Sequence, residues 1–229
     1  NALMKEQYMM GKNLNAMELK VLQEQINPHF LYNTLDLILW TAKHNDMEQV
    51  CDIVIKLSKF YRISLSNGSD YIDLKNEIEH VRLYTELQNL RFSKKINLTV
   101  NIEKSLENYK IMKLFLQPIV ENSILHGISN SDVEQGEINI SAAINEDMVQ
   151  IIVTDNGIGM SKSTIYRLMT YDEFHTDKEN LGGYGLRNVI NRLKLYYDNQ
   201  AQISFESAPN KGTKVIISIP YMYRQRNLS

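Results

Sequence analysis

The chain has 229 residues, of which 43% are hydrophobic and 23% are charged, so it is long enough for one large domain or two small ones. Its formal net charge of −2 argues against nucleic acid or an anionic membrane surface as a partner, and favours a small ligand or a protein. No apolar run reaches the roughly 18 residues of a membrane-spanning helix, and the single cysteine excludes an internal disulfide and fits a reducing cytosolic setting.

Two amphipathic helices are predicted at the start of the chain. Apolar residues recur at three- and four-residue steps from about residue 3 to residue 44 and again over 47–65, with a break at His44-Asn45-Asp46. A hairpin of two helices cannot enclose a core, so we expect two copies to pair into a four-helix bundle. Because the pattern is already helical at Asn1, we also expect a longer parent protein.

The first predicted helix contains a polar and aromatic patch, residues 25–36. Pro28 is expected to bend or loosen the helix interior where His29 projects, because proline removes a backbone donor and clashes with the preceding turn. A histidine with a pKa of about 6.5 is mostly neutral near pH 7 and offers a ring nitrogen as nucleophile. A lone helical histidine is more often a surface or core residue, so the rest of the chain has to support this role.

The segment Asn67-Gly68-Ser69-Asp70 is the best linker candidate, which divides the chain into domains 1–68 and 69–229. In the second domain we expect helices at 73–91, 112–128 and 186–197, and strands at 96–102, 138–144, 149–153, 202–207 and 213–219. The continuous apolar run 149–153 suits a central strand, and the irregular residues 161–181 suit a lid. The predicted fold class is α+β, a helical hairpin followed by an α/β sandwich.

Three polar clusters in the second domain suit a nucleotide site, although each is weak alone. In the first, Glu121 and Asn122 are followed one helical turn later by His126, on the same face as Asn122. An amide oxygen is a hard ligand that suits Mg²⁺ held mainly by phosphates and waters. A helix cap or a surface pair explains this cluster equally well.

The other two clusters are rich in glycine. Asp155-Asn156-Gly157-Ile158-Gly159-Met160 follows the central strand, where the glycines let the backbone approach a flat ligand and Asp155 accepts a hydrogen bond. Gly182-Gly183-Tyr184-Gly185 precedes the helix that begins near Leu186, so its free amides suit phosphate oxygens. The alternative for both is a plain turn.

In this order, and with Lys211-Gly212-Thr213 near the end, the clusters resemble the ATP-binding domain of the GHKL superfamily. The whole chain resembles sensor histidine kinases of the LytS/YesM type. Residues 25–35 look like the phosphoacceptor box of that group, 117–127 like its Asn box, and 155–159 with 182–186 like its two glycine boxes.

The resemblance implies a homodimer in which the γ-phosphate of ATP is delivered to His29 and then to an aspartate of a response-regulator receiver domain. Asp155 would read the adenine amine, with Thr213 helping through water, and Asn122 would hold Mg²⁺. The implied ATP-binding residues are Glu121, Asn122, His126, Asp155, Gly157, Gly159, Gly182, Gly183, Gly185, Leu186 and Thr213. The chain would be the cytoplasmic portion of a plasma-membrane sensor, reaching the membrane only through a missing N-terminal region.

Asn33 is a further candidate, because it lies one helical turn after His29 on the same face. Its amide could orient a water for attack on the aspartyl phosphate of the receiver. Alternatively, it holds the helix beside Pro28 or fixes the tautomer of His29.

Three positions depart from the wider pattern. Phe30 stands where many histidine kinases have an acid, and Leu125 where relatives often have a lysine. Pro118 replaces the hydrolytic glutamate of the chaperone and gyrase relatives, which disfavours simple ATP hydrolysis. The alternatives that remain are a GHKL ATPase clamp and a nucleotide-binding dimer without kinase activity.

Overall fold

The computed structural model describes residues 27–65, 69–92, 94–170 and 184–221. The chain divides into two compact units, residues 1–68 and 69–229. The part of the first predicted helix that precedes residue 27 lies outside the described residues. Among the residues that are described, no helix has both the length and the apolar character needed to cross a membrane.

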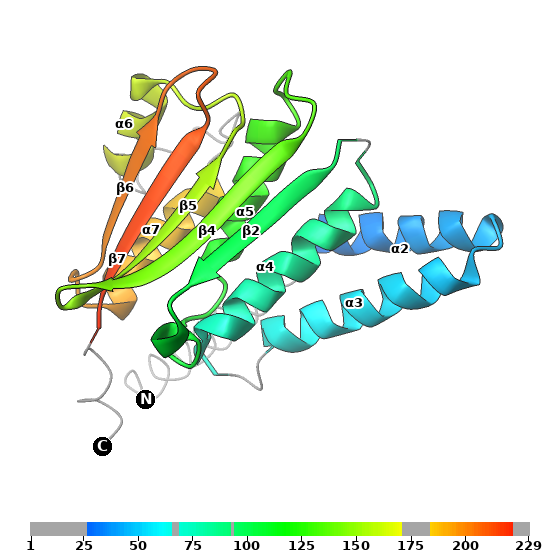
Figure 1. The fold of residues 1–229 in the computed structure, drawn as a ribbon, viewed down its shortest axis with the longest axis horizontal. Coiled ribbons are helices and arrows are strands. Elements are labelled where there is room, and N and C mark those ends of the chain that lie inside the picture. The colour runs from blue at the N-terminus through cyan, green and yellow to red at the C-terminus, as the bar shows by residue number, and fades with distance from the viewer. Residues whose placement is uncertain (1–26, 66–68, 93, 171–183, 222–229) are drawn as a thin grey trace, which may run out of the picture. The chain divides into compact units, whose positions relative to one another are not determined.

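The first unit is a helical hairpin of α2 (Pro28–Lys43) and α3 (Met47–Leu65), joined by a short turn at residues 44–46 (Figure 1). The two helices pack through Phe30 and Phe60, whose ring centroids lie 4.9 Å apart. Many large apolar side chains of the hairpin remain exposed: Tyr32, Leu35, Leu39, Trp40, Met47, Val54, Ile55 and Leu65. The hairpin therefore carries apolar surface that it does not bury itself.

Pro28 is the first residue of α2, so the prediction of a proline in a helix interior is wrong. Asn27 has non-helical backbone angles (φ −65°, ψ 102°), and its side-chain oxygen accepts a hydrogen bond of 3.2 Å from the Phe30 N–H. Asn27 is thus the N-cap, and Pro28 is the first helical residue, where the missing N–H costs nothing. As a result, His29 lies in the first turn of α2.

The second unit is built on a five-stranded sheet. In spatial order its strands are β2 (Ile96–Ile102), β4 (Gly136–Asn145), β5 (Met148–Asp155), β7 (Thr213–Pro220) and β6 (Gln202–Ser207). Strands β2 and β4 are parallel, and the other neighbours are antiparallel. The predicted central strand is central, and the predicted α+β fold class is confirmed.

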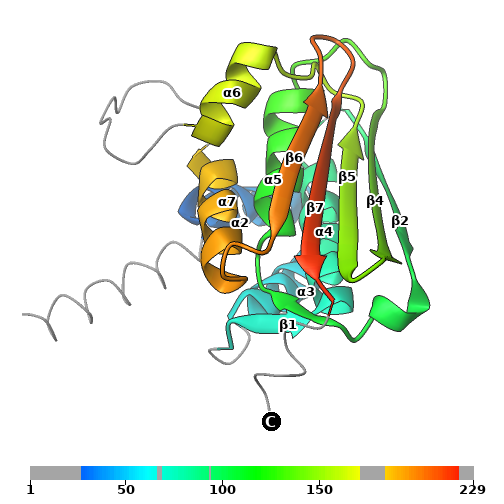
Figure 2. The same cartoon turned by 90° about the vertical axis from the view of Figure 1, so that its left-hand side faces the viewer.

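Helices cover one face of this sheet. They include α4 (Leu74–Asn89), α5 (Leu116–Asn122) and α7 (Tyr184–Tyr196), which lie on the same side of the strands (Figure 2). Along β4, the buried residues Ile138, Ile140 and Ala142 alternate with exposed Glu137 and Asn139, as expected for a sheet with one packed face. The core lies between this sheet face and the helices.

The predicted helix at 112–128 is wrong at its start, and its last part is a π-helix. A short strand, β3 (Lys110–Met112), pairs antiparallel with β1 (Tyr71–Asp73), and α5 begins only at Leu116. After Asn122 the helix widens into a π-helical segment, η3 (Ser123–Ile128). The apolar periodicity of the sequence indicates neither the strand β3 nor the π-helical segment η3, since both depend on partners that are distant in sequence.

Two further short helices lie in connections. One is the 3-10 turn η2 (Lys104–Leu106). The other is α6 (Lys162–Thr170), found where the sequence indicated an irregular segment at 161–181. Leu168 is buried and anchors α6, while residues 171–181 of that segment lie outside the described part.

Candidate nucleotide-binding site

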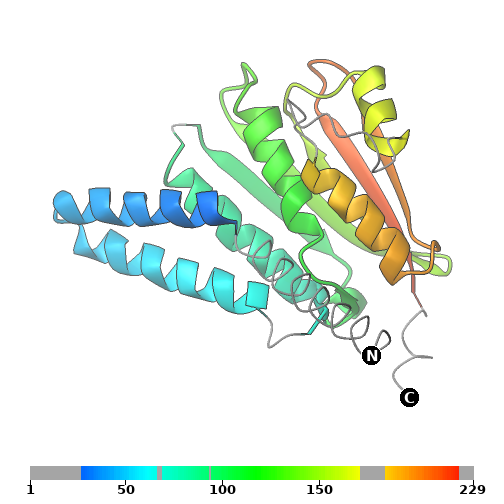
Figure 3. The same ribbon diagram turned by 180° about the vertical axis from the view of Figure 1, so that it is seen from behind.

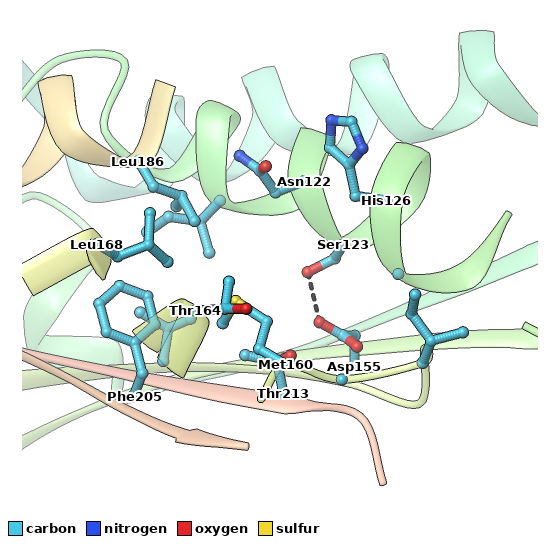
Figure 4. A pocket seen from close by; sticks show the side chains of 15 residues that line it. Asn122, Ser123, His126, Asp155, Met160, Thr164, Leu168, Leu186, Phe205 and Thr213 are labelled. Carbon is cyan, nitrogen blue, oxygen red and sulfur yellow. Dashed lines mark hydrogen bonds between the residues drawn. The ribbon is translucent and has the colours of Figure 1, made fainter. Parts of the chain in front are cut away.

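A pocket of about 220 Å³ opens between the helical and the sheet layers of the second unit (Figure 4). Its walls come from α5, η3, α6, the start of α7, the loop after β5, and strands β6 and β7. The predicted site residues that line it are Asn122, His126, Asp155, Gly159, Leu186 and Thr213. The structure thus brings residues of the first two polar clusters together with Thr213 and with Leu186, which follows the third cluster.

Other predicted site residues stand elsewhere. Glu121 is not among the residues that line the pocket, and its charge instead acts on buried Tyr84 of α4. Gly182 and Gly183 lie outside the described residues. His29 and Asn33 belong to α2 of the first unit.

Asp155 ends β5 and forms the polar end of the pocket. Its Oδ2 accepts a hydrogen bond of 2.7 Å from the Ser123 hydroxyl, drawn as a dashed line in Figure 4, and its Oδ1 accepts one of 2.9 Å from the Gly157 N–H. Burial raises the pKa of this carboxyl, while the bonds from Ser123, Gly157 and the Thr213 backbone lower it in part. A partly buried carboxylate held in this way is a strong acceptor for a ligand N–H.

The loop after Asp155 packs directly on the main chain of η3. A Cβ atom on Gly157 would lie 2.5 Å from the carbonyl carbon of Gly127, so no side chain fits there. The Ile158 N–H donates to the Gly127 carbonyl at 3.2 Å, and Gly159 has a φ of +67°, in the left-handed region. These two glycines therefore serve the close approach and the turn, and Gly159 also lines the pocket.

The amide of Asn122 has a defined orientation. Its Nδ2 donates a hydrogen bond of 2.6 Å to the Pro118 carbonyl, so its Oδ1 is the atom left to ligate or accept. The π-helical turn that follows places Ser123, His126 and Gly127 along the same pocket as Asn122. Such π-segments are rare and are frequent at functional sites.

The opposite wall of the pocket is apolar. It includes Met160, Leu168, Phe205 and Val215, which sequence reasoning did not select. Ser123 was also missed, although its place directly after Asn122, on a helix facing the end of a central strand, was a usable signal. An apolar slot with one partly buried carboxylate suits a flat heterocycle that carries an N–H donor.

Family models match most of the chain. Residues 17–96 match the model described as histidine kinase, and residues 109–222 match the model of histidine kinase-, DNA gyrase B- and HSP90-like ATPases. The fold and the second match define an ATPase domain of the GHKL class.

Similar curated proteins narrow the family assignment from ATPases of the GHKL class to sensor histidine kinases. The chain is 34% identical over 222 residues to the sensor histidine kinase YesM of Bacillus subtilis (strain 168), which is 96% of this chain and 36% of that protein. It is 30% identical over 209 residues to the sensor protein kinase HptS of Staphylococcus aureus (strain USA300), covering 91% of this chain and 39% of that protein. The chain belongs to the sensor histidine kinase family, and it spans little more than a third of the length of these relatives.

Solved structures were also found to be similar. The catalytic domain of the histidine kinase ThkA shares 19% identity at a TM-score of 0.47, over 66% of this chain and 94% of that one. The histidine kinase domain of the blue-light activated kinase from Erythrobacter litoralis EL346 shares 14% identity at a TM-score of 0.48, over 92% of this chain and 94% of that one. The family assignment rests on the sequence matches rather than on these two likenesses.

Ser123→Ala should raise the pKa of Asp155 further. The Ser123 hydroxyl stabilises the charged carboxylate through its hydrogen bond, so removing it should move the pKa of Asp155 further above its ordinary value. Carboxyl ¹³C NMR titration measures this pKa directly. Ser129→Ala is the matched control, because that hydroxyl bonds the Ile124 carbonyl and no carboxylate. An unchanged pKa in Ser123→Ala would contradict the electrostatic role of this serine.

Proposed function

We propose that this chain is a protein-histidine kinase that transfers the γ-phosphate of ATP to His29 and then to an aspartate of a response-regulator receiver domain. The observation that carries the proposal is the pocket in which a partly buried carboxylate, Asp155, faces an apolar slot while Asn122 and His126 stand along the same wall (Figure 4). Since ATP is a cytoplasmic substrate, we place this portion on the cytoplasmic side of a membrane-anchored sensor.

The residues of the pocket fit ATP with Mg²⁺. Asp155 would accept the adenine amine between apolar residues such as Leu168 and Phe205. No group of three His, Cys, Asp or Glu suited to a metal exists among the described residues. A hard cation would therefore be held by the Asn122 Oδ1 together with phosphate and water oxygens, which is how Mg²⁺ is usually bound at nucleotides. Bound Mg²⁺ would neutralise phosphate charge.

His29 has the exposure that a phosphoacceptor needs. It lies in the first turn of α2, and its side chain is exposed. By contrast, His80 of α4 is fully buried, and burial lowers its pKa to about 3. His44 is exposed, and its Nδ1 lies 2.8 Å from the Trp40 carbonyl. His29 and His44 are both exposed and both lie within the matched residues 17–96, but His29 stands in the first turn of α2 beside Asn33, whereas His44 caps the end of that helix.

ATP binding should depend on Asp155. Asp155→Ala would leave the adenine amine without its acceptor, which costs about 1–3 kcal/mol and lowers the affinity by roughly 5- to 150-fold. Isothermal titration calorimetry with Mg-ATP measures this. Asp147→Ala, at an exposed aspartate of the β4–β5 turn, is the control. In unmodified protein, binding should also weaken as the pH falls through the raised pKa of Asp155, because the protonated carboxyl accepts poorly. If Asp155→Ala and the unmodified chain bound Mg-ATP with equal affinity, Asp155 would not be the acceptor of the adenine amine.

Autophosphorylation should occur at His29. In His29→Gln, labelling from γ-labelled ATP should disappear, while calorimetric ATP affinity stays unchanged because His29 belongs to the other unit. His44→Gln is the control and should keep the label. The bond should be acid-labile and alkali-stable. Steady phosphate release without any protein label would instead favour an ATPase clamp. ATP binding with neither phosphate release nor protein labelling would favour a non-catalytic dimer.

The hairpin should hold two copies of the chain together. Exposed Leu39 of α2 and Ile55 of α3 belong to apolar surface that a single hairpin leaves uncovered. Leu39→Glu with Ile55→Glu should convert a dimer into a monomer in analytical ultracentrifugation. Tyr166→Glu, at an exposed aromatic residue of the other unit, should leave the dimer intact. A monomeric unmodified chain at micromolar concentration would speak against the bundle.

Asn33 should act in the return reaction. Its Nδ2 lies 3.1 Å from both ring nitrogens of His29, so this contact does not select one tautomer. Holding the helix beside Pro28 and orienting a water are the two roles that stay compatible with this contact, and we propose the second. Asn33→Ala should keep His29 labelling and lose dephosphorylation of the receiver, both followed by gel assays with labelled protein. If His29 labelling falls in step, Asn33 belongs to the geometry of the acceptor and the phosphatase role should be dropped.

A further inference from the structure

A buried glutamate caps the helix that carries Asn122. Glu77, in the first turn of α4, is fully buried. Its Oε2 accepts from the Leu114 N–H, and its Oε1 accepts from the N–H groups of Phe115 and Leu116, all at 2.8 Å. Helix α5 has no side-chain cap from its own N-cap residue. A residue of another helix therefore satisfies the free amides at its start.

Two carbonyl groups of the same turn, those of Lys113 and Leu114, accept hydrogen bonds from helix α7. Arg192 of α7 donates from Nη2 to the Lys113 carbonyl at 2.8 Å and from Nη1 to the Leu114 carbonyl at 3.3 Å. Leu114 has a φ of 56°, in the left-handed region that a leucine adopts only when its surroundings hold it there. Glu77 and Arg192 provide that hold.

The charge state of Glu77 matters for this clamp. Burial raises the pKa of Glu77, whereas the three main-chain bonds and the charge of Arg192 lower it. Both oxygens of Glu77 accept hydrogen bonds from main-chain N–H groups. Only the ionised carboxylate can do this, because a protonated carboxyl would point its O–H toward one of these N–H groups. A glutamine of nearly the same shape would set its NH₂ group against a main-chain N–H.

The clamped turn lies at the far end of two pocket elements. Helix α5 begins at the turn and ends at Asn122, while α7 lines the pocket with Leu186 near its start and reaches back to the turn with Arg192. The two helices lie side by side (Figure 3). Near their pocket ends, a Cβ on Gly185 would stand 4.0 Å from the Asn122 Nδ2. The position of Asn122 therefore depends on where the turn is held.

We propose that Glu77 and Arg192 are positioning residues, which clamp the 113–116 turn and thereby place the Asn122 amide oxygen for the metal that accompanies the nucleotide. This inference rests on the proposed function. Neither residue lines the pocket. Their effect is expected in the gain in ATP affinity that Mg²⁺ provides, because this gain depends on where the Asn122 oxygen lies. A misplacement of a group by about 1 Å can cost roughly 100-fold in a geometry-dependent step.

The test compares ATP binding by the full chain in Mg²⁺ and in EDTA. In Glu77→Gln, the gain in ATP affinity on adding Mg²⁺ should fall about tenfold, while affinity in EDTA changes less than about twofold because Asp155 stays in place. Glu79→Gln makes the same chemical change on the same helix, at a partly exposed residue that pairs with Arg82, and should keep the gain. A merely structural role would lower both affinities together with the melting temperature.

Arg192→Gln provides a second variant if Glu77→Gln does not fold, because Arg192 is only partly buried and its loss leaves the three Glu77 bonds in place. The same selective loss of the Mg²⁺ gain is expected, and Lys194→Gln, at an exposed lysine of α7, is its control. An unmodified chain that does not bind ATP would overturn the proposed function. A folded variant that binds ATP with the full Mg²⁺ gain would overturn this inference alone.

Discussion

The pocket depends on one contact between two main-chain segments, the packing of Gly157 against Gly127. Since no side chain intervenes, the loop after β5 lies against η3, and Asp155 comes within hydrogen-bonding distance of Ser123. The same contact removes water from one side of the carboxylate, and polar interactions become stronger where the local dielectric is low. A single steric condition thus creates both the shape of the pocket and the chemical character of its polar end.

Local periodicity predicted much of the second unit. The alternation of apolar residues along Ile138, Ile140 and Ala142 corresponds to the buried face of β4, and the continuous apolar run after residue 149 corresponds to the central strand β5. The polar clusters flank these elements, and it was their resemblance to the GHKL ATP-binding domain that implied one site for Asn122, Asp155 and Thr213, which do line one pocket. Patterns of period two and 3.6 are properties of neighbouring residues, and sequence alone contains them.

The sequence-based predictions of secondary structure fail mainly where residues distant in sequence determine the local conformation. The turn at 113–116 exists because Glu77 and Arg192 hold it, and η3 is not distinguishable from an α-helix by apolar spacing. Pro28 is different, since the signal was present: asparagine followed directly by proline is the usual pair of N-cap and first helical residue. The long helical pattern before Asn27 outweighed that signal in the sequence-based interpretation.

The strand order also dictates how the domain acquires its pocket during folding. The hairpins β4–β5 and β6–β7 join residues close in sequence, whereas the pairing of β5 with β7 sets Asp155 opposite Thr213 across the segment that contains α6, α7 and β6. Pairings of high contact order form slowly, because loop entropy is lost before any contact compensates for it. The two sides of the pocket meet only once β5 and β7 have paired, so chains without this pairing lack the binding site. A ligand of this pocket then stabilises only the finished fold by mass action, so the lifetime of the domain in the cell rises with the concentration of that ligand.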